Sequence, residues 1–396
     1  MTCAPLRLKK NADKRLRAGH LWIYSNEVDT AATPLVGFSA GQQAVVESST
    51  GKPLAIATVN PNTLICGRVV SRDTQYTLDK SLLVHRIKVA LGLRERLFAE
   101  PYYRLVYGDS DLLPGLVVDR FGDYLVVQIS TWGMEAVKED IVEALVKVLK
   151  PAGILFRNNG SGRKLEAIPE YIETPWGEVP DNVPLIENDT QFVAPVREGQ
   201  KTGWFYDHRP ARAQLNEWVK GARVLDVFSY VGGWGVQAAV AGAEEVYCVD
   251  SSATALEYVH QNAELNGVGE KVATFEGDAF AALKELHAGE QRFDVVIVDP
   301  PAFIKRKKDI RAGEQAYRRI NELAMRLLKR DGLLVSCSCS MHLERDRLLD
   351  TLRAASRHLD RNLQLVAECH QGADHPIHPA IAETAYIKAL FCRVTV

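Results

Sequence analysis

Two cysteines lie one residue apart near the end of the chain. The segment SCSCSMHL, residues 336–343, contains Cys337 and Cys339, two of the seven cysteines among 396 residues. A protonated cysteine packs in a core like a small apolar residue, whereas a thiolate binds metal or attacks an electrophile. The pair could therefore be core packing, part of a metal or redox site, or a source of one nucleophile.

A metal site is the weakest of these interpretations. A closed zinc site needs four ligands, and no second cysteine or histidine pair with familiar zinc spacing follows SCSCSMHL. Seven cysteines are an odd number scattered through a large chain, unlike the disulfide framework of a small secreted protein. We therefore predict no metal and mostly reduced thiols, and burial stays open for either cysteine.

The second half of the chain predicts the elements that position these cysteines. From about Gly221, apolar strands alternate with amphipathic helices, which predicts a doubly wound, mostly parallel sheet. Ligands bind such sheets at the carboxyl ends of the strands, and both cysteines fall at the end of the fifth strand. The helices are expected to begin near Gly235, Thr254, Phe280, Glu314 and Leu343.

Three acids end the first three predicted strands, namely Asp226, Asp250 and Asp278. The segment GWGVQA, residues 233–238, formally satisfies the G-x-G-x-x-A pattern of a dinucleotide site, so NAD is an alternative. However, these glycines lie several residues past the strand and an acid precedes them. Acids at three strand ends suit a ligand with a ribose, an adenine amino group and a cationic amino acid part but no pyrophosphate. S-adenosylmethionine has those parts, and residues 191–396 resemble a class I methyltransferase.

The turn VDPPAF follows the fourth strand. Its two prolines remove N–H donors and fix the backbone, so that Asp299 and the neighbouring carbonyl groups are held rigidly beside the cofactor. Similar D/N-P-P turns in class I enzymes bind the polar edge of a flipped base, although an isolated turn of this kind is often only a strand end. The basic run KRKKDIR then follows, which could hold phosphates or be a solvated loop.

A cysteine beside such a turn separates two kinds of base methylation. A ring nitrogen or an amine already has a usable lone pair. The C5 atom of cytosine is a poor nucleophile, so an enzyme that methylates it must first add a thiolate at C6. A free thiol with a pKa of about 8.5 is only a few per cent ionised at neutral pH, so cationic groups or a helix N-terminus would have to help.

The first residues of the chain are basic and aromatic. The segment LRLKKNADKRLRAGHLW carries six Lys or Arg residues against the single acid Asp13, and short β-type runs continue to about Ser71. These runs predict a small barrel, and GHLWIYSNEV after a basic segment resembles the start of a PUA domain, an RNA-binding barrel. A solvated basic face is the alternative.

The whole composition is that of an ordinary globular protein. It is 46% hydrophobic and 25% charged. The net charge of −2 argues against a protein that binds polyanions over its whole surface. No uncharged apolar run reaches the length of a membrane helix, and we expect a cytoplasmic protein. We predict a PUA-like domain at residues 1–75, a middle α+β domain at 76–190 and a seven-stranded, Rossmann-like α/β methyltransferase domain at 191–396.

Essentially the whole chain resembles the bacterial large-subunit (23S) ribosomal RNA cytosine-C5 methyltransferase I family. The resemblance lies in the order of its parts, which are the barrel start, the middle unit, QKTGWFYDHRPAR, DVFSYVGGWG, VDPPAF and SCS. The family's single S-C-S pattern matches Ser338 to Ser340, which implies that Cys339 is the nucleophile and Cys337 an extra packing residue. The resemblance also places QKTGWFYDHRPAR, residues 200–212, next to the pocket, with Asp207 among its candidates.

The resemblance implies the following site residues. The expected catalytic residues are Cys339 and Asp299. Expected cofactor contacts are Asp226, Phe228, Tyr230, Gly232, Gly233, Asp250, Asp278, Ala279 and Asp299. Expected RNA or substrate contacts are Lys9, Lys10, Lys14, Arg15, Lys201, Phe205, Arg209, Pro300, Lys305 and Lys307.

The predicted function is therefore methylation of a cytosine C5 in large-subunit ribosomal RNA, with S-adenosylmethionine as cofactor and through a covalent cysteine adduct. We expect the target base to be extruded into the pocket. We expect no membrane or metal partner, and a homodimer is possible. Three alternatives stay open: an RNA guanine-N methyltransferase, a non-catalytic RNA-binding ribosome assembly factor, and a small-molecule methyltransferase. The base that removes the C5 proton is not apparent from the residues.

Overall fold

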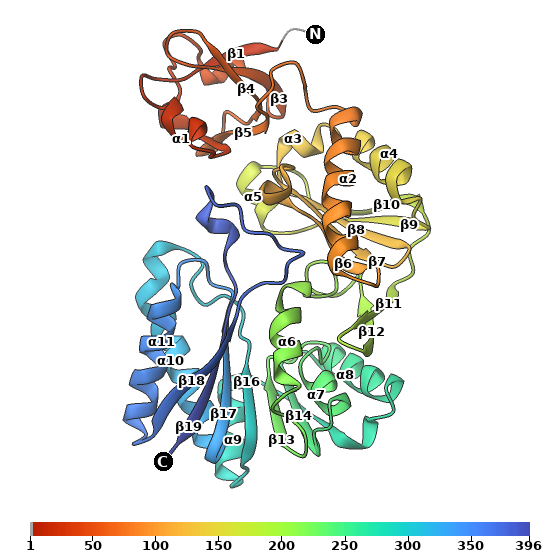
Figure 1. The fold of residues 1–396 in the computed structure, drawn as a ribbon, viewed down its shortest axis with the longest axis vertical. Helices are drawn as coiled ribbons and strands as arrows, with labels where there is room; N and C mark the ends of the chain where they lie inside the picture. Colours follow the sequence, from red (N-terminus) through yellow and green to blue (C-terminus); the bar gives the residue numbers. More distant parts are fainter. Residues whose placement is uncertain (1–2) are drawn as a thin grey trace. The chain divides into compact units, whose positions relative to one another are not determined.

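The computed structural model describes residues 3–396 and shows two compact units (Figure 1). Residues 1 and 2, which the first predicted domain includes, lie outside the described residues. Unit 1 contains the chain up to Val183 together with Pro195–Trp204 and Ala373–Thr384. Unit 2 contains Pro184–Ala194, Phe205–Gly372 and Ala385–Val396. Each unit thus combines segments that are far apart in the sequence.

The first sheet of unit 1 has the order β1-β3-β4-β5-β2. Strand β1 pairs in parallel with β3, and the other pairs are antiparallel. Alternating apolar side chains such as Leu6, Ile23 and Val46 fill its interior, and Ile381 from near the end of the chain is buried among them. The strands and the one α-helix of this part are β1 (Ala4–Arg7), α1 (Asp13–Arg17), β2 (Trp22–Tyr24), β3 (Gln42–Glu47), β4 (Pro53–Val59) and β5 (Ile65–Ser71).

The second sheet of unit 1 has the order β10-β9-β8-β7-β6 and its own core. Helices α2 and α4 pack together and bury Leu83, Ile87, Ile141 and Leu145 against the sheet. The elements are α2 (Lys80–Leu97), β6 (Tyr102–Tyr107), β7 (Leu116–Phe121), β8 (Tyr124–Ile129), α3 (Trp132–Glu135), α4 (Lys138–Leu149), β9 (Gly153–Asn158), α5 (Gly162–Glu166) and β10 (Tyr171–Gly177). Only β8 and β9 are parallel.

A two-stranded sheet of β11 (Asn182–Glu187) and β12 (Thr190–Pro195) follows. Its two turn residues, Asn188 and Asp189, both have positive φ angles, 49° and 61°. Tight hairpin turns require this backbone, and Asn and Asp tolerate it better than most residues.

Unit 2 contains a seven-stranded sheet with the order β15-β14-β13-β16-β17-β19-β18. The first five strands along the chain are parallel, and β19 runs antiparallel between β17 and β18. The strands are β13 (Arg223–Val227), β14 (Glu245–Asp250), β15 (Val272–Glu276), β16 (Phe293–Val298), β17 (Leu328–Ser338), β18 (Asn362–Cys369) and β19 (Lys388–Thr395). The predicted doubly wound, mostly parallel sheet is confirmed.

Helices cover this sheet in the alternating order that the sequence predicts (Figure 1). They are α6 (Arg209–Leu215), α7 (Gly235–Val240), α8 (Ala253–Leu265), α9 (Ala279–Ala288), α10 (Ile310–Leu327) and α11 (Arg345–His358). Helix α10 begins four residues before the predicted Glu314, because the short 3₁₀ helix η6 (Lys307–Asp309) leads directly into it. The other 3₁₀ helices are η1 (Ser25–Glu27), η2 (Leu35–Gly37), η3 (Gly108–Asp111), η4 (Tyr206–His208), η5 (Gly269–Lys271) and η7 (Ala382–Thr384).

The order of the strands fixes where a ligand can bind. Strand β13 is flanked by β14 on one side and by β16 on the other, so the strand order reverses at β13. A crevice forms at the carboxyl ends of strands at such a switch point. The loops after β13, β14, β16 and β17 therefore meet there. Among the described helices, none is long and apolar enough to cross a membrane.

Candidate active site

The loop between β13 and α7 has an unusual backbone. Phe228, Tyr230 and Gly232 have φ angles of 68°, 51° and 86°, a left-handed region that only glycine adopts freely. The N–H groups of Phe228 and Ser229 both donate to the carbonyl oxygen of Val249, at 2.9 and 3.0 Å, which bends the loop over the end of β14. Non-glycine residues in this region cost free energy and cluster at ligand sites.

Asp226 lies beneath this loop and is completely buried. Its Oδ2 accepts the N–H of Gly235 at 2.9 Å, while its Oδ1 has no hydrogen-bond partner within the part of the chain that the structure describes. The pKa of Asp226 is raised to about 8, mainly by burial and in smaller part by the charges of Asp299 and Asp250. A buried carboxylate oxygen without a partner fits a ligand that brings a hydrogen-bond donor.

The other two acids of this half serve the backbone as well. Asp250 accepts the N–H of Tyr230 on Oδ2 and the N–H of Ser252 on Oδ1, both at 2.9 Å. Asp278 caps helix α9, because its Oδ1 accepts the N–H of Ala281 at 3.0 Å. A carboxylate has about four acceptor positions, so each acid keeps capacity for a ligand donor. The left-handed loop, the unpartnered oxygen of Asp226 and these acids fit S-adenosylmethionine.

Asp299 directly follows β16 and is held by two donors. Its Oδ1 lies 3.2 Å from Nε2 of His208, and its Oδ2 accepts the indole N–H of Trp234 at 3.0 Å. Burial alone would lower the pKa of His208, but the charge and hydrogen bond of Asp299 outweigh burial and raise it. Burial would likewise raise the pKa of Asp299, whereas the His208 imidazolium keeps it below its ordinary value. The two side chains therefore form a buried ion pair.

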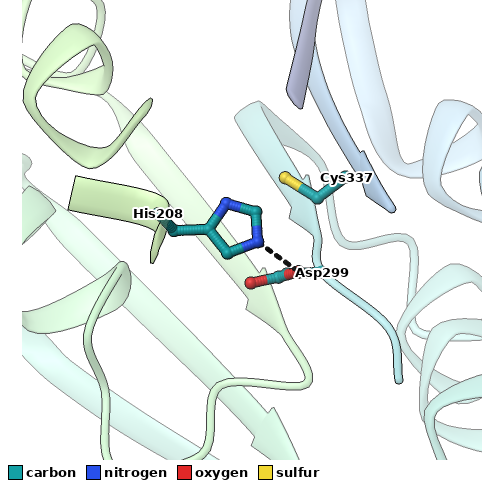
Figure 2. A group of neighbouring side chains, drawn as sticks. All are labelled: His208, Asp299 and Cys337. Carbon is teal, nitrogen blue, oxygen red and sulfur yellow. Dashed lines mark ion pairs between the residues drawn. The ribbon is translucent and has the colours of Figure 1, made fainter. Parts of the chain in front are cut away.

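Cys337 is the third member of this group (Figure 2). One side-chain atom each of His208, Asp299 and Cys337 lie within 4.8 Å of one another. The Cys337 side chain is completely buried, and burial holds the pKa of its thiol well above the ordinary value. A metal would have to remove the proton of His208 and ionise this thiol. The chemistry of the group therefore favours a protonated thiol beside an ion pair over a metal site.

Cys339 has a different environment at the end of β17. It is half-buried, and its Sγ lies 4.0 Å from the carbonyl oxygen of Pro300 in the DPP turn. The serines on either side are both fixed by Tyr317: Ser338 Oγ lies 2.9 Å from the Tyr317 hydroxyl, and so does Ser340 Oγ. The backbone around Cys339 is thus held firmly while its sulfur reaches the site.

Lys388 begins β19 directly opposite Ser338 in the antiparallel register. Its ammonium donates to the carbonyl oxygen of Ser340 at 2.9 Å and is half-buried. Burial lowers the pKa of Lys388 to about 8, and the charge of Cys339 acts in the opposite direction. A lysine with a pKa near neutrality next to a thiol is a candidate for proton exchange.

The segment 200–212 divides between the two units. Lys201 belongs to unit 1, whereas Phe205 and Arg209 belong to unit 2. The ring of Phe205 contacts that of Tyr230 edge to face, with centroids 5.6 Å apart, so it lies against the cofactor loop. Arg209 pairs with the buried Glu187 at 3.3 Å.

Two more side chains of this segment have structural partners. Arg212 pairs with Glu187 at 2.6 Å. The carboxylate of Asp207 accepts the hydroxyl of Tyr386 at 2.6 Å. Both contacts anchor the segment within unit 2, which carries His208 to Asp299.

The predicted basic contacts fall into two groups. In the first sheet of unit 1, Lys9 donates to the carbonyl oxygen of Asn26 at 2.9 Å, and Arg15 pairs with Glu27 at 3.1 Å. Lys10 and Lys14 are exposed beside them. In unit 2, Lys305 and Lys307 are exposed in the segment before α10, and Pro300 is buried.

Sequence reasoning missed three residues of the site: His208, Lys388 and Tyr317. His208 stands inside the segment QKTGWFYDHRPAR, and it is the one side chain there that titrates near neutral pH. A lysine in the apolar run AYIKALFCRVTV was the signal for Lys388. Helical spacing places Tyr317 in the core, and no sequence signal pointed to its two serine partners.

Comparison with known proteins agrees with this geometry. The pattern of the S-adenosylmethionine-dependent methyltransferase family matches residues 167–393, and the pattern of the PUA-like domain matches residues 6–72. The chain is 34% identical over 397 residues to the "Ribosomal RNA large subunit methyltransferase I" of Erwinia tasmaniensis, covering 98% of this chain and 99% of that protein. The protein of the same name from Aliivibrio fischeri is 34% identical over 392 residues, covering 98% of both chains.

Solved structures share the fold at lower identity. A methyltransferase complexed with SAH has a TM-score of 0.84 at 19% identity, covering 98% of this chain and all of that one. A SAM-dependent methyltransferase from Streptococcus mutans has a TM-score of 0.83 at 18% identity with the same coverage. With the family pattern over more than half of its length and curated relatives over almost all of it, the chain belongs to the ribosomal RNA large subunit methyltransferase I family of S-adenosylmethionine-dependent methyltransferases.

Proposed function

We propose that this protein methylates the C5 atom of a cytosine in large-subunit ribosomal RNA, with Cys339 as the nucleophile. The observation that carries the proposal is the position of Cys339: a half-buried thiol whose Sγ lies 4.0 Å from the Pro300 carbonyl oxygen at the carboxyl end of the sheet. A nitrogen methyltransferase has no need of a thiol there, because its target atom already carries a lone pair.

The two cysteines have different chemical environments. Cys337 is completely buried, and burial keeps its thiol protonated against the ion pair of His208 and Asp299. Cys339 is two residues further along the chain and is partly exposed. A nucleophile has to contact substrate and lose its proton, so these environments favour Cys339.

The chemical step needs only this thiolate and a proton acceptor. The Cys339 thiolate adds to C6 of the cytosine, and the electrons of the C5–C6 double bond move to C5, which becomes nucleophilic. S-adenosylmethionine supplies an electrophilic methyl group for C5. Loss of the C5 proton then re-forms the double bond and expels the Cys339 thiolate, so the enzyme returns to its starting state.

We propose that Asp299 orients the base. Its carboxylate already accepts from His208 and Trp234, one donor on each oxygen, and its side chain is 19% exposed. A carboxylate can accept further donors, and the exocyclic amino group of cytosine is one. Because His208 and Trp234 fix the carboxylate plane, the accepting lone pairs keep their direction before the base arrives.

The first sheet of unit 1 offers a surface for RNA. A pocket with a volume of about 140 Å³ is lined by the basic side chains of Arg17, His20 and Arg72 and by apolar residues. Lys10 and Lys14 are exposed on the preceding segment. Arginine and lysine neutralise phosphates, and a PUA-like domain matches these residues, so we propose that this sheet docks the RNA. The cytoplasmic location expected from the sequence is part of this proposal.

Mapping of 5-methylcytidine in ribosomal RNA tests the function. We expect one position to lose its methyl group in a strain without the gene, by bisulfite sequencing and mass spectrometry, and to regain it with the wild-type gene but not with Cys339→Ala. Loss of a methylguanosine with unchanged 5-methylcytidine would instead identify a guanine-N enzyme. Unchanged modification together with no binding of S-adenosylmethionine would identify a non-catalytic RNA-binding protein.

A further inference from the structure

We propose that Lys388 activates Cys339: its side chain accepts the thiol proton and its ammonium then stabilises the thiolate. Lys388 is in this sense a positioning residue, because it acts on the substrate through Cys339. The inference rests on the proposed role of Cys339 as nucleophile and names the cationic group that an attack at neutral pH requires.

The register of the sheet places Lys388 beside the end of the strand that leads into Cys339. Lys388 lies opposite Ser338, the last residue of β17, so it is next to the point where Cys339 leaves the strand. The Nζ atom is fixed by a 2.9 Å hydrogen bond to the carbonyl oxygen of Ser340, the residue after Cys339. The same Ser340 is tied through its hydroxyl to Tyr317 and accepts the N–H of Ile304 at 3.2 Å. The lysine is therefore anchored to the segment that carries the thiol.

The electrostatics of the neighbourhood favour proton exchange. Burial lowers the pKa of Lys388 to about 8, close to that of an ordinary thiol, and the opposing influence on it comes from Cys339. The charged side chains packed against β19 pair among themselves, Arg345 with Glu368 and Arg393 with Asp331, and three titratable groups at the Lys388 end of the strand are neutral near pH 7. Burial raises the pKa of Tyr317 to about 12, and burial also raises those of Cys337 and Cys369. The ion pair of thiolate and ammonium thus has no competing charge among these groups.

The step balances without a further reactant. The proton of Cys339 Sγ moves to the neutral Nζ of Lys388, and the electron pair of the S–H bond stays on sulfur. The thiolate then forms the bond to C6 and later leaves with the same electron pair. The proton on Lys388 is available again for the thiolate once product has left, so the pair is regenerated in each cycle.

Alkylation of Cys339 by iodoacetamide tests this pairing without RNA. The rate is followed against pH in the full-length protein, and tandem mass spectrometry separates Cys339 from Cys337 on their shared peptide. We expect an inflection in the wild type below the ordinary thiol value of about 8.5. In Lys388→Met the inflection should move upward and the rate at pH 7 should fall at least about tenfold, which corresponds to one unit of pKa.

Three comparisons make the test specific. Lys388→Arg keeps a cation and should keep the inflection below 8.5, whereas Lys329→Met, at the opposite end of β17, should leave the profile unchanged. An unchanged profile in Lys388→Met, or a wild-type inflection at or above the ordinary value, overturns the proposal. The second outcome needs no variant, so the test survives if Lys388→Met fails to fold.

The result is independent of the proposed function. If Lys388 sets the alkylation profile but ribosomal RNA retains all its 5-methylcytidine without the gene, the pairing stands and the cytosine-C5 assignment fails. If the methylation maps as proposed and Lys388→Met alkylates like the wild type, the assignment stands and the pairing fails.

Discussion

The two halves of the site at the carboxyl end of the sheet are built differently. In the cofactor half, three acids accept backbone N–H groups from nearby loops or helices. Asp226 accepts from Gly235, Asp250 from Tyr230, and Asp278 from Ala281. In the substrate half, Asp299 and Cys339 depend on side chains that lie about 50 to 90 residues away in the sequence.

The difference predicts that the substrate half carries the specificity. Backbone donors tolerate many side chains, so the cofactor half needs little more than glycines and acids at strand ends. In the substrate half, Asp299 pairs with His208, and the partner that we propose for Cys339 is Lys388; each pair would lose its charge balance if one partner changed. Variants in the two halves should therefore have separable effects on cofactor binding and on methyl transfer.

Replacement of the thiol should give the largest effect. Cys339→Ala removes the atom that adds to C6, and we expect methyl transfer to RNA to fall below detection while binding of S-adenosylmethionine persists. Radioactive methyl transfer and calorimetric cofactor binding measure the two properties. Cys337→Ala is the matched control two residues away and should retain most activity. The reverse pattern would assign the nucleophile to Cys337.

Loss of His208 should weaken the substrate half next. His208→Asn removes the cation that pairs with the Asp299 carboxylate, and a lost hydrogen bond to a charged group costs about 1.5–3 kcal/mol, or roughly 10- to 150-fold in methyl transfer. The exposed His260 on α8, which is hydrogen-bonded to Thr274 of β15, gives the control variant His260→Asn. Equal activity of both variants would show that Asp299 needs no cation.

The same pair predicts a pH dependence of stability. The pKa of His208 is raised, so its contribution is complete below about pH 6.5 and is lost as the pH rises through the raised value. The pKa of Asp299 is lowered, so its contribution is present above about pH 3.9 and is lost at lower pH. The free energies of urea unfolding of wild type and His208→Asn should differ most between these limits and approach each other as the pH rises through the raised pKa of His208. A constant difference would contradict the ion pair.

A smaller effect is expected in the cofactor half. Asp250→Asn leaves an oxygen that can accept one of the two N–H groups of Tyr230 and Ser252, but without charge. Hydrogen bonds to an ionised acceptor are roughly twice as strong as neutral ones, so we expect about tenfold weaker binding of S-adenosylmethionine. The rate at saturating cofactor should change little. A loss of rate with unchanged affinity would remove the distinction between the halves.

The smallest effect concerns the support of Cys339. Tyr317→Phe removes the hydroxyl that contacts both Ser338 and Ser340, at a cost of about 1 kcal/mol, or roughly fivefold in methyl transfer. Cofactor affinity should be unchanged, because Tyr317 lies in α10 behind the substrate half. An effect on cofactor affinity alone would place this hydroxyl network in the other half of the site.

The sequence could predict the helices and strands of this site better than the contacts between its side chains. The alternation of strands and helices indicated the sheet, and the predicted starts at Gly235, Thr254 and Phe280 agree with α7, α8 and α9 to within one residue. Local patterns carry this information because a helix start and a strand end depend on neighbouring residues. The approach of His208 to Asp299 depends on packing between distant segments, for which one sequence has no periodic signal.

The burial of Ile381 in the first sheet has a consequence for synthesis of the chain. Its side chain is completely buried with Leu6, Ile23 and Val46, and it is made more than 300 residues after the strand that ends at Ser71. Chains emerge from the ribosome N-terminus first, at about 5–20 residues per second. At the slower of these rates, roughly half a minute or more of translation separates the strands of the first sheet from Ile381. During that time the interior of the first sheet would have an unfilled position. The earliest part of the protein to emerge is therefore among the last to be finished.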